Sequence, residues 1–400
     1  MKNKILLLLL FVILLKTNAQ EAIVFDNQER RVITTGVPFV LIAPDARAAS
    51  MGDMGVATSA DAFSQQWNSA KYAFSSTKSG VAVSYTPYLN KLVNDVFLGN
   101  VTYFNRLDER SAFAASFKYF SLGDIEFVQD EFSQSLIQRP NELTIDASYA
   151  LRLSDKFALS VAMRYLRSDL KLDTGSNDTA AASTFGVDVS GFYQSNIKTY
   201  NNFDGRWRAG FALQNMGPKF SYDEGGQDNF QPTLLRLGGG FDFIFNPKNK
   251  LAVTAEIGKL LVPTPPIYGF VDLNNNQIQD GNESTIIVKG KDPDVNFLSG
   301  MFQSFTDAPD GFSEELKEFT WALGAEYVYQ DAFAFRGGYF NENEDKGARK
   351  FLALGAGFKY EAMTIDFSYL FSTSKVQSPL ENTLRFSLTF NIGTGTYSNF

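Results

Sequence analysis

One stretch of the chain carries oxygen-bearing side chains at the spacing of a calcium-binding loop. Positions 1, 3, 5, 9 and 12 of residues 272–283 are held by Asp272, Asn274, Asn276, Asp280 and Glu283. Calcium takes carboxylate and amide oxygens at such positions, and glycine at position 6 usually allows the sharp turn. Position 6 here is Gln277, and two of the five side chains are neutral amides, so we expect weak affinity. The pattern predicts a structural calcium that stiffens a loop, with a plain Asn/Asp-rich turn as the alternative.

Two residue types that carry much of enzyme chemistry are missing from the sequence. The chain contains no histidine and no cysteine. Without histidine, a serine or cysteine nucleophile lacks its usual general base, and without cysteine there is neither a disulfide nor a lipid-anchored N-terminus. The formal charge of -8 argues against nucleic-acid binding. We therefore expect a protein that is not an enzyme and requires no cofactor, apart from the calcium considered above.

From about residue 80 to residue 392, the sequence repeats segments of roughly ten residues in which apolar and polar side chains alternate. Successive side chains of a strand face opposite sides, so each segment has one apolar and one polar face. The predicted strands are 80–88, 95–105, 110–120, 142–152, 156–167, 184–194, 205–215, 233–244, 249–259, 319–329, 332–340, 351–360, 363–372 and 382–392. This pattern predicts an all-β fold, a transmembrane antiparallel β-barrel of about 14 strands, rather than a soluble sandwich or propeller.

The connections between these strands support the barrel. Short turns alternate with long connections, which are 121–141, 168–183, 216–232 and 260–318. Short periplasmic turns and long extracellular loops are typical of outer-membrane barrels. The charged residues predicted to face the lumen are Lys118, Asp146, Arg164, Arg208, Glu256, Glu326, Arg336, Lys359, Asp366 and Arg385. Their mixed signs favour ion pairs over a selective pore.

The start of the chain predicts export. Residues 1–19 have a basic start, an apolar run and a small-residue cleavage site, as in a secretory signal peptide. No later run of about 20 apolar residues could form a spanning helix. We expect a location in the outer membrane of a Gram-negative bacterium, in contact with its lipid, with both termini periplasmic. Residues 20–79 do not resemble strands, and we expect them to form a plug segment in the lumen of the barrel 80–400, with a disordered periplasmic tail as the alternative.

The longest connection, residues 260–318, is the predicted site of partner contact. Loops of this length are usually functional, and this extracellular loop is unusually apolar. The candidate anchors are Phe297, Leu298, Met301, Phe302 and Phe305. The loop either folds over the barrel mouth or offers a surface to a partner. A second feature, Gly238–Gly240 within a predicted strand, either opens a lateral gap in the wall or makes room for the plug.

The N-terminal segment resembles a known family. Residues 37–58 (VPFVLIAPDARAASMGDMGVAT) and 61–74 are similar to PorV, the outer-membrane barrel of the type IX secretion system, whose fold is related to that of the fatty-acid transporter FadL. Such N-termini usually contain Asn-Pro-Ala, where this chain has Asn68-Ser69-Ala70. The resemblance is specific in this segment and generic in the strands that follow.

The resemblance implies a non-enzymatic role in secretion. PorV-type proteins receive cargo with C-terminal sorting domains from the translocon barrel, called Sov or SprA. They pass the cargo to a cell-surface attachment complex that contains the sortase-like protease PorU. The main alternative is a FadL-like channel for hydrophobic small molecules, which needs an apolar pocket and a lateral gap. A purely structural barrel is a third reading, disfavoured by so large an outer loop.

Overall fold

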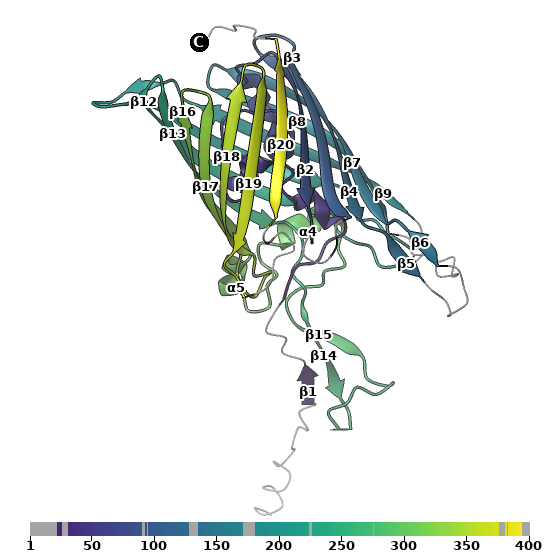
Figure 1. The fold of residues 1–400 in the computed structure, drawn as a ribbon. Helices are drawn as coiled ribbons and strands as arrows, with labels where there is room; N and C mark the ends of the chain where they lie inside the picture. The colour runs from purple at the N-terminus through teal and green to yellow at the C-terminus, as the bar shows by residue number, and fades with distance from the viewer. Residues whose placement is uncertain are drawn as a thin grey trace, which may run out of the picture.

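The computed structural model describes residues 22–25, 31–89, 93, 95–127, 135–170, 181–223, 226–274, 276–375, 381 and 383–393. The predicted signal peptide lies outside them. Fourteen antiparallel strands form a closed barrel, in which β20 pairs with β2 and β9 with β11 (Figure 1). They are β2 (Ser79–Pro87), β3 (Val96–Arg106), β4 (Ser111–Leu122), β7 (Asn141–Ser154), β8 (Phe157–Asp169), β9 (Ala182–Gln194), β11 (Asp204–Met216), β12 (Leu234–Asn246), β13 (Asn249–Leu260), β16 (Phe319–Tyr329), β17 (Phe333–Asn341), β18 (Lys350–Tyr360), β19 (Met363–Ser372) and β20 (Leu384–Ile392). The predicted number is confirmed, and every predicted boundary lies within two residues of the observed one.

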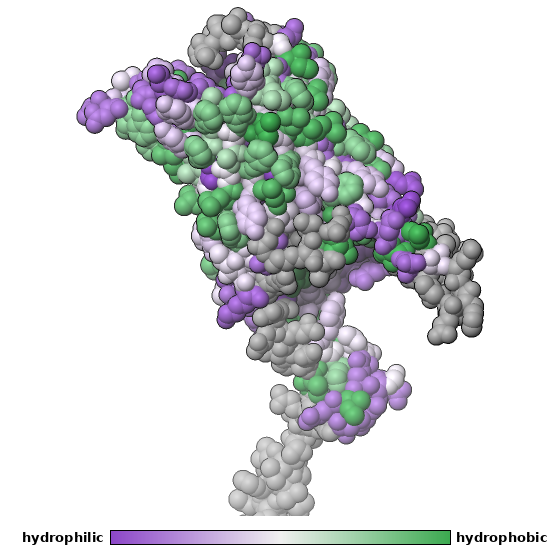
Figure 2. Space-filling view, viewed as in Figure 1, coloured by the Kyte–Doolittle hydropathy of each residue, from purple (hydrophilic) through white to green (hydrophobic). Residues whose placement is uncertain are grey.

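The alternation of residue types places apolar side chains outside and polar ones inside. On β4, Phe117 is 42% exposed on the outer wall while its neighbour Lys118 is 2% exposed in the lumen. Figure 2 shows the resulting apolar surface on the flank of the barrel. Such a band suits contact with lipid, because lipid tails offer no hydrogen bonds to polar groups. Of the charged residues predicted to face the lumen, all are buried except Lys359, which is exposed.

The connections sort by length between the two ends of the barrel. One end has tight turns, such as those at 155–156 and 361–362, and we call it the short-turn end. The other, the long-loop end, carries β5 (Ile125–Phe127) with β6 (Leu136–Gln138), and β14 (Ile267–Asp272), β15 (Thr285–Lys289), α4 (Phe297–Gln303) and α5 (Phe312–Lys317). A further strand, β10 (Lys198–Thr199), adds to β11 at the short-turn end. No helix in the described residues is long and apolar enough to cross a membrane.

The described ends of the chain lie at opposite ends of the barrel. The N-terminal strand β1 (Ala22–Phe25) pairs with β14, so it lies at the long-loop end (Figure 1). Strand β20 finishes at the short-turn end, where Ile392 pairs with Ser79. This differs from the prediction of two periplasmic termini. The reason is that the segment before β2 runs through the whole lumen, from the long-loop end to the short-turn end.

Four short helical turns form the part of the chain inside the lumen. They are η1 (Pro38–Leu41), α2 (Ala46–Ser50), α3 (Ser64–Trp67) and η2 (Ser69–Phe74). Asp45 caps α2, since its side chain accepts the N–H of Ala48 at 2.8 Å. The other carboxylate oxygen of Asp45 accepts the indole N–H of Trp67, also at 2.8 Å, and so ties α2 to α3. The segment thus has a polar framework of its own.

The barrel wall holds this segment from several sides. Hydrogen-bonding groups come from many strands of the wall, among them Lys118 of β4, Gly191 of β9, Arg208 of β11, Glu256 of β13, Glu326 of β16 and Ser387 of β20. Glu256 accepts the backbone N–H groups of Gly55 and Val56, each at 2.9 Å. Because buried polar groups are costly when unpaired, these bonds fix both the position and the fold of the segment. The predicted mixed-sign ion pairs are also present, as in Arg336 with Glu326 and Asp366.

One of the three consecutive glycines of β12, Gly238, makes room for the lumen segment. A Cβ on Gly238 would lie 2.6 Å from the side chain of Val56, whereas one on Gly239 would meet nothing closer than 3.9 Å. The pairing of β12 with β11 and β13 continues without a break through Gly240. Gly238 therefore serves close packing with the lumen segment, and the wall has no lateral gap at Gly238–Gly240.

Candidate functional site

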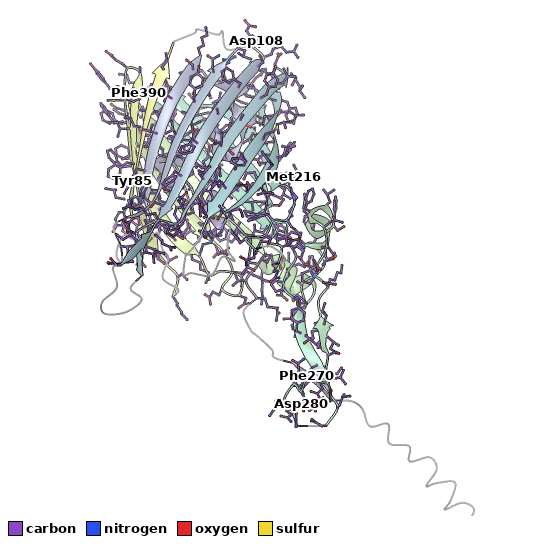
Figure 3. The ribbon with its side chains drawn as sticks, turned by 90° about the vertical axis from the view of Figure 1, so that its right-hand side faces the viewer. Tyr85, Asp108, Met216, Phe270, Asp280 and Phe390 are labelled. Atoms are coloured by element: carbon purple, nitrogen blue, oxygen red, sulfur yellow. The ribbon has the colours of Figure 1, made fainter. Side chains whose placement is uncertain are left out.

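The long loop between β13 and β16 builds most of the structure at the long-loop end. Its hairpin of β14 and β15 projects beyond the barrel, with Phe270 on β14 and Asp280 in the turn (Figure 3). Strand β1 pairs along β14 and completes a three-stranded sheet. Helices α4 and α5 follow the hairpin and lie close to the barrel mouth (Figure 1). The long-loop end thus carries a three-stranded sheet and the helices α4 and α5, whereas the short-turn end has mainly tight turns.

A buried lysine of the wall fixes α5 to the barrel. Lys259, on β13, is 1% exposed, and its ammonium lies 2.5 Å from a carboxylate oxygen of Glu318 and 3.1 Å from one of Glu315. Glu318 also accepts the hydroxyl of Thr264 at 2.6 Å. Removing one partner of such a buried pair leaves the other charge without compensation. The contact therefore holds α5 over the mouth.

A second carboxylate of α5, that of Glu314, forms ion pairs with the N-terminal segment and with the β17–β18 connection. Glu314 receives Arg31 at 2.8 Å and Lys346 at 2.7 Å. Burial alone would raise the pKa of Glu314, but hydrogen bonds from Arg31 and Lys346 outweigh it and hold this pKa at about 2. This stabilisation is present above the ordinary glutamate pKa and is lost as the pH falls toward 2. Helix α5 thus joins three segments that are far apart in sequence.

Asp307 lies buried beneath the same loop. It is 1% exposed, and one carboxylate oxygen accepts the N–H of Thr264 at 3.0 Å. Burial raises the pKa of Asp307 to about 6; the hydrogen bond from Thr264 opposes this shift, while the carboxylates of Glu315 and Glu318 add to it. Because folding raises this pKa, Asp307 stabilises the folded loop at low pH, and this stabilisation is lost as the pH rises through about 6.

The five predicted anchor residues lie on α4 or just after it, and they differ in exposure. Phe302 is 77% exposed, Leu298 is 53% exposed and Phe305 is 41% exposed. Phe297 is half-buried, and Met301 is only 7% exposed, so Met301 cannot act as an exposed anchor. The sequence did not separate the two faces of α4 because the helix itself was not predicted. Residues 298, 302 and 305 follow the helical spacing of one face, whereas 297 and 301 follow the other.

Two further apolar side chains are exposed on α5. Phe312 is 76% exposed and Leu316 is 55% exposed. They are spaced four residues apart, so they share a face of the helix. These two residues were not among the predicted anchors. Their i, i+4 spacing was the signal that could have found them.

The five candidate calcium ligands lie together in the β14–β15 turn. Asp272 accepts the backbone N–H groups of Asn276 and Gln277, at 3.1 and 2.8 Å. Glu283 accepts those of Leu273 and Asp280, at 2.7 and 3.0 Å. Gln277 has a φ of 63°, the left-handed conformation for which glycine is usual at this position.

These contacts satisfy the candidate ligands with the loop's own donors. Nowhere in the described part of the chain are three or more acidic, histidine or cysteine side chains placed to hold a metal ion. The geometry is thus that of a turn held by its own hydrogen bonds, with oxygen atoms that match calcium in type and spacing. Calcium binding here stays a prediction.

Calcium is expected to protect this turn from proteolysis. At about ten times its dissociation constant, a ligand that binds only the folded turn should slow cleavage about 10-fold. The measurement is mass spectrometry of proteinase K fragments within residues 272–283, with and without calcium. Magnesium, which prefers a rigid octahedral shell, is the control. The variant Asp280→Asn/Glu283→Gln should lose the protection. Equal cleavage of the natural chain with and without calcium would exclude the calcium site and favour the plain Asn/Asp-rich turn.

Comparison with known proteins identifies the family. Residues 25–267, more than half of the chain, match the family described as type IX secretion system protein PorV. No curated protein matches the chain. Among solved structures, it is similar to the Pseudomonas putida toluene transporter TodX, with 12% identity and a TM-score of 0.50, covering 86% of this chain and 97% of that one.

Two further solved structures are similar to this chain. A ΔS2S3 mutant of the TodX monoaromatic hydrocarbon channel has 10% identity and a TM-score of 0.52, covering 87% of this chain and 99% of that one. A Pseudomonas aeruginosa FadL homologue has 11% identity and a TM-score of 0.43, covering 90% and 99%. At these identities, the TodX likeness shows the fold alone, a closed barrel of the FadL and TodX type. The match to the family model goes further: this outer-membrane β-barrel protein belongs to the PorV family of the type IX secretion system.

Proposed function

We propose that the protein receives secreted cargo bearing C-terminal sorting domains from the translocon barrel, which is of the Sov or SprA type. It then delivers the cargo to a PorU-like attachment complex at the cell surface. The family is generally non-enzymatic and belongs to this secretion system, which supports the proposal. In this role the barrel is a docking platform in the outer membrane and needs no open pore.

The observation that carries the proposal is the contrast between the lumen and the long-loop end. The lumen is occupied by residues 37–75, which the wall holds by buried hydrogen bonds and ion pairs. The long-loop end instead displays a projecting sheet and two helices with exposed apolar side chains. Exposed apolar patches on ordered elements commonly mark protein interaction sites. This division of structure suits docking better than conduction.

The test is gentle detergent extraction of the protein, followed by mass spectrometry of what accompanies it. We expect a very large barrel and secreted proteins that share a C-terminal domain. The variant Leu298→Ser/Phe302→Ser removes the two most exposed predicted anchors. It should lower cargo recovery about 10-fold, which corresponds to about 1.4 kcal/mol of binding free energy from the two side chains together. The matched control is Ile278→Ser, which changes a 66% exposed apolar residue of the same loop outside α4. Unchanged recovery in the α4 variant would remove α4 as the docking surface.

A hydrophobic channel is the second function to consider, because the TodX structures are described as a toluene transporter and a monoaromatic hydrocarbon channel. Two observations weigh against it. The wall is continuous at Gly238–Gly240. The cavity between the lumen segment and the wall beside Leu41, Leu260 and Phe340 has a volume of about 60 Å³, and a second one, lined by charged groups such as Arg47 and Arg336, has about 230 Å³. Ligand pockets usually measure at least about 300 Å³. Recovery of the protein alone with an apolar small molecule would reverse this judgement.

A further inference from the structure

A groove opens at the long-loop end, between two connections of the barrel. Its volume is about 630 Å³, within the range of ligand-binding pockets. One side is formed by the β11–β12 connection, including Lys219 and residues 226–230, and the other by residues 262–268 and 292–294 of the long loop. The groove is distinct from the exposed face of α4, and nothing in the function argued above uses it.

The side of the groove formed by residues 262–268, which we call its floor, is rich in proline. It includes Pro263, Pro265 and Pro266, whose rings fix the backbone and which offer carbonyl oxygens but no N–H groups. Thr264, between Pro263 and Pro265, is held by two buried carboxylates. Asp307 accepts its backbone N–H at 3.0 Å, and Glu318 accepts its hydroxyl at 2.6 Å. A proline-lined floor held in place by buried carboxylates needs little reorganisation to accept a ligand.

Aromatic side chains flank this floor. Tyr268 is 49% exposed, and Phe230 is half-buried beneath the ammonium of Lys219, which lies 4.9 Å from the ring centroid. Aromatic and proline surfaces are the usual lining of grooves that bind extended peptides. The prolines of the floor and these rings therefore suit a polypeptide in extended conformation.

The charges of the groove are unbalanced. Its lining contains three carboxylates, of Asp228, Asp292 and Asp294, and one ammonium, of Lys219. Lys219 is already paired, 3.0 Å from Asp294, and its side chain is only 13% exposed, whereas that of Asp294 is 90% exposed. Asp228 and Asp292 are also exposed. An incoming chain therefore meets net negative charge at the rim, and positive charge on that chain would be complementary.

We infer that this groove binds an extended peptide segment that carries lysine or arginine side chains. The proline-rich floor and the rings take the backbone and the aliphatic stems, and the rim carboxylates take the cationic ends. This inference rests on the proposed function, for which it names one docking site for an arriving protein. A small apolar molecule fits less well, because the groove is open to solvent and lined by charged groups.

The test uses the full-length protein in detergent and fluorescence anisotropy with two labelled twelve-residue probes, (Lys-Ser-Val)₄ and (Glu-Ser-Val)₄. The lysine probe should bind and the glutamate probe should not. The variant Asp292→Asn/Asp294→Asn should weaken binding of the lysine probe about 10-fold, which corresponds to about 1.4 kcal/mol. The matched control, Asp124→Asn/Asp223→Asn, removes two exposed carboxylates at the same end of the barrel but outside the groove and should leave binding unchanged.

Three results would overturn the inference: no binding of the lysine probe, equal binding of both probes, or equal weakening by the two double variants. The last would show attraction to the overall negative charge and not to the groove. The fate of the proposed function is separate. If the translocon and cargo still accompany the natural protein while the lysine probe fails to bind, the groove assignment falls and the secretion role stands. If neither accompanies it, the secretion role falls whatever the probe does.

Discussion

Deleting residues 20–55 is expected to convert a closed barrel into a conducting one. The deletion removes α2 and the backbone of Gly55, and with them the bonds to Glu326 and Glu256 of the wall. These carboxylates would then face an opened lumen and hold water. A barrel of fourteen strands encloses a lumen too wide for its own wall side chains to close. In planar bilayers, we expect single-channel conductance to rise at least several-fold above that of the natural protein.

The matched control is deletion of residues 20–30 alone. This removes β1, which pairs with β14 outside the lumen, and leaves the segment from residue 37 onward in place. Its conductance should equal that of the natural protein. Heat-dependent mobility in gel electrophoresis would show that each barrel is folded and inserted. If a folded barrel that lacks residues 20–55 still conducts no more than the control, something other than this segment closes the lumen.

Replacing Lys259 by methionine should release the long loop from the barrel mouth. Methionine keeps much of the side-chain volume but leaves Glu315 buried without its cation, and leaves Glu318 with Lys346 as its remaining cation. Breaking a buried pair on one side costs about 3–5 kcal/mol. If the loop opens and closes faster than it is cut, about 3 kcal/mol corresponds to a rise of roughly 100-fold in proteinase K cleavage within residues 261–318. Fragment masses measured over time give this rate.

Lys317→Met is the control for that experiment. Lys317, on α5, lies 2.8 Å from Asp345, but both side chains are well exposed, at 45% and 38%. Exposed pairs of this kind contribute less than about 1 kcal/mol, so cleavage should change only a few-fold. Adding Glu315→Gln to Lys259→Met should restore part of the protection, because the carboxylate that lost its cation is then neutral, while Glu318 keeps its pair with Lys346. Equal cleavage of the two single lysine variants would mean that Lys259 does not hold the loop closed.

The sequence by itself determined the barrel. In a wall with lipid on one side and a polar lumen on the other, side chains must alternate, and strands such as β16 and β19 have the boundaries that this alternation predicted. The short turns between the strands also followed from this pattern, because they are the points where the alternation stops. At two of them the structure has polar residues with positive φ angles, Gln330-Asp331 and Glu361, as tight hairpin turns require. The mixed charges inside also followed, because buried charges need partners.

Only the tertiary structure decided the arrangement at the long-loop end. That β1 would pair with β14 depends on contacts between residues more than two hundred positions apart, which no local pattern records. The burial of Met301 and the exposure of Phe302 depend on which face of α4 meets its neighbours. Likewise, Lys259 and Glu318 are ordinary charged residues in the sequence, and only the folded loop brings them to 2.5 Å. The membrane and the polar lumen impose the same alternation of apolar and polar residues on every strand, so the pattern repeats in the sequence. The packing of the loops depends on individual contacts between distant residues, which leave no repeated pattern.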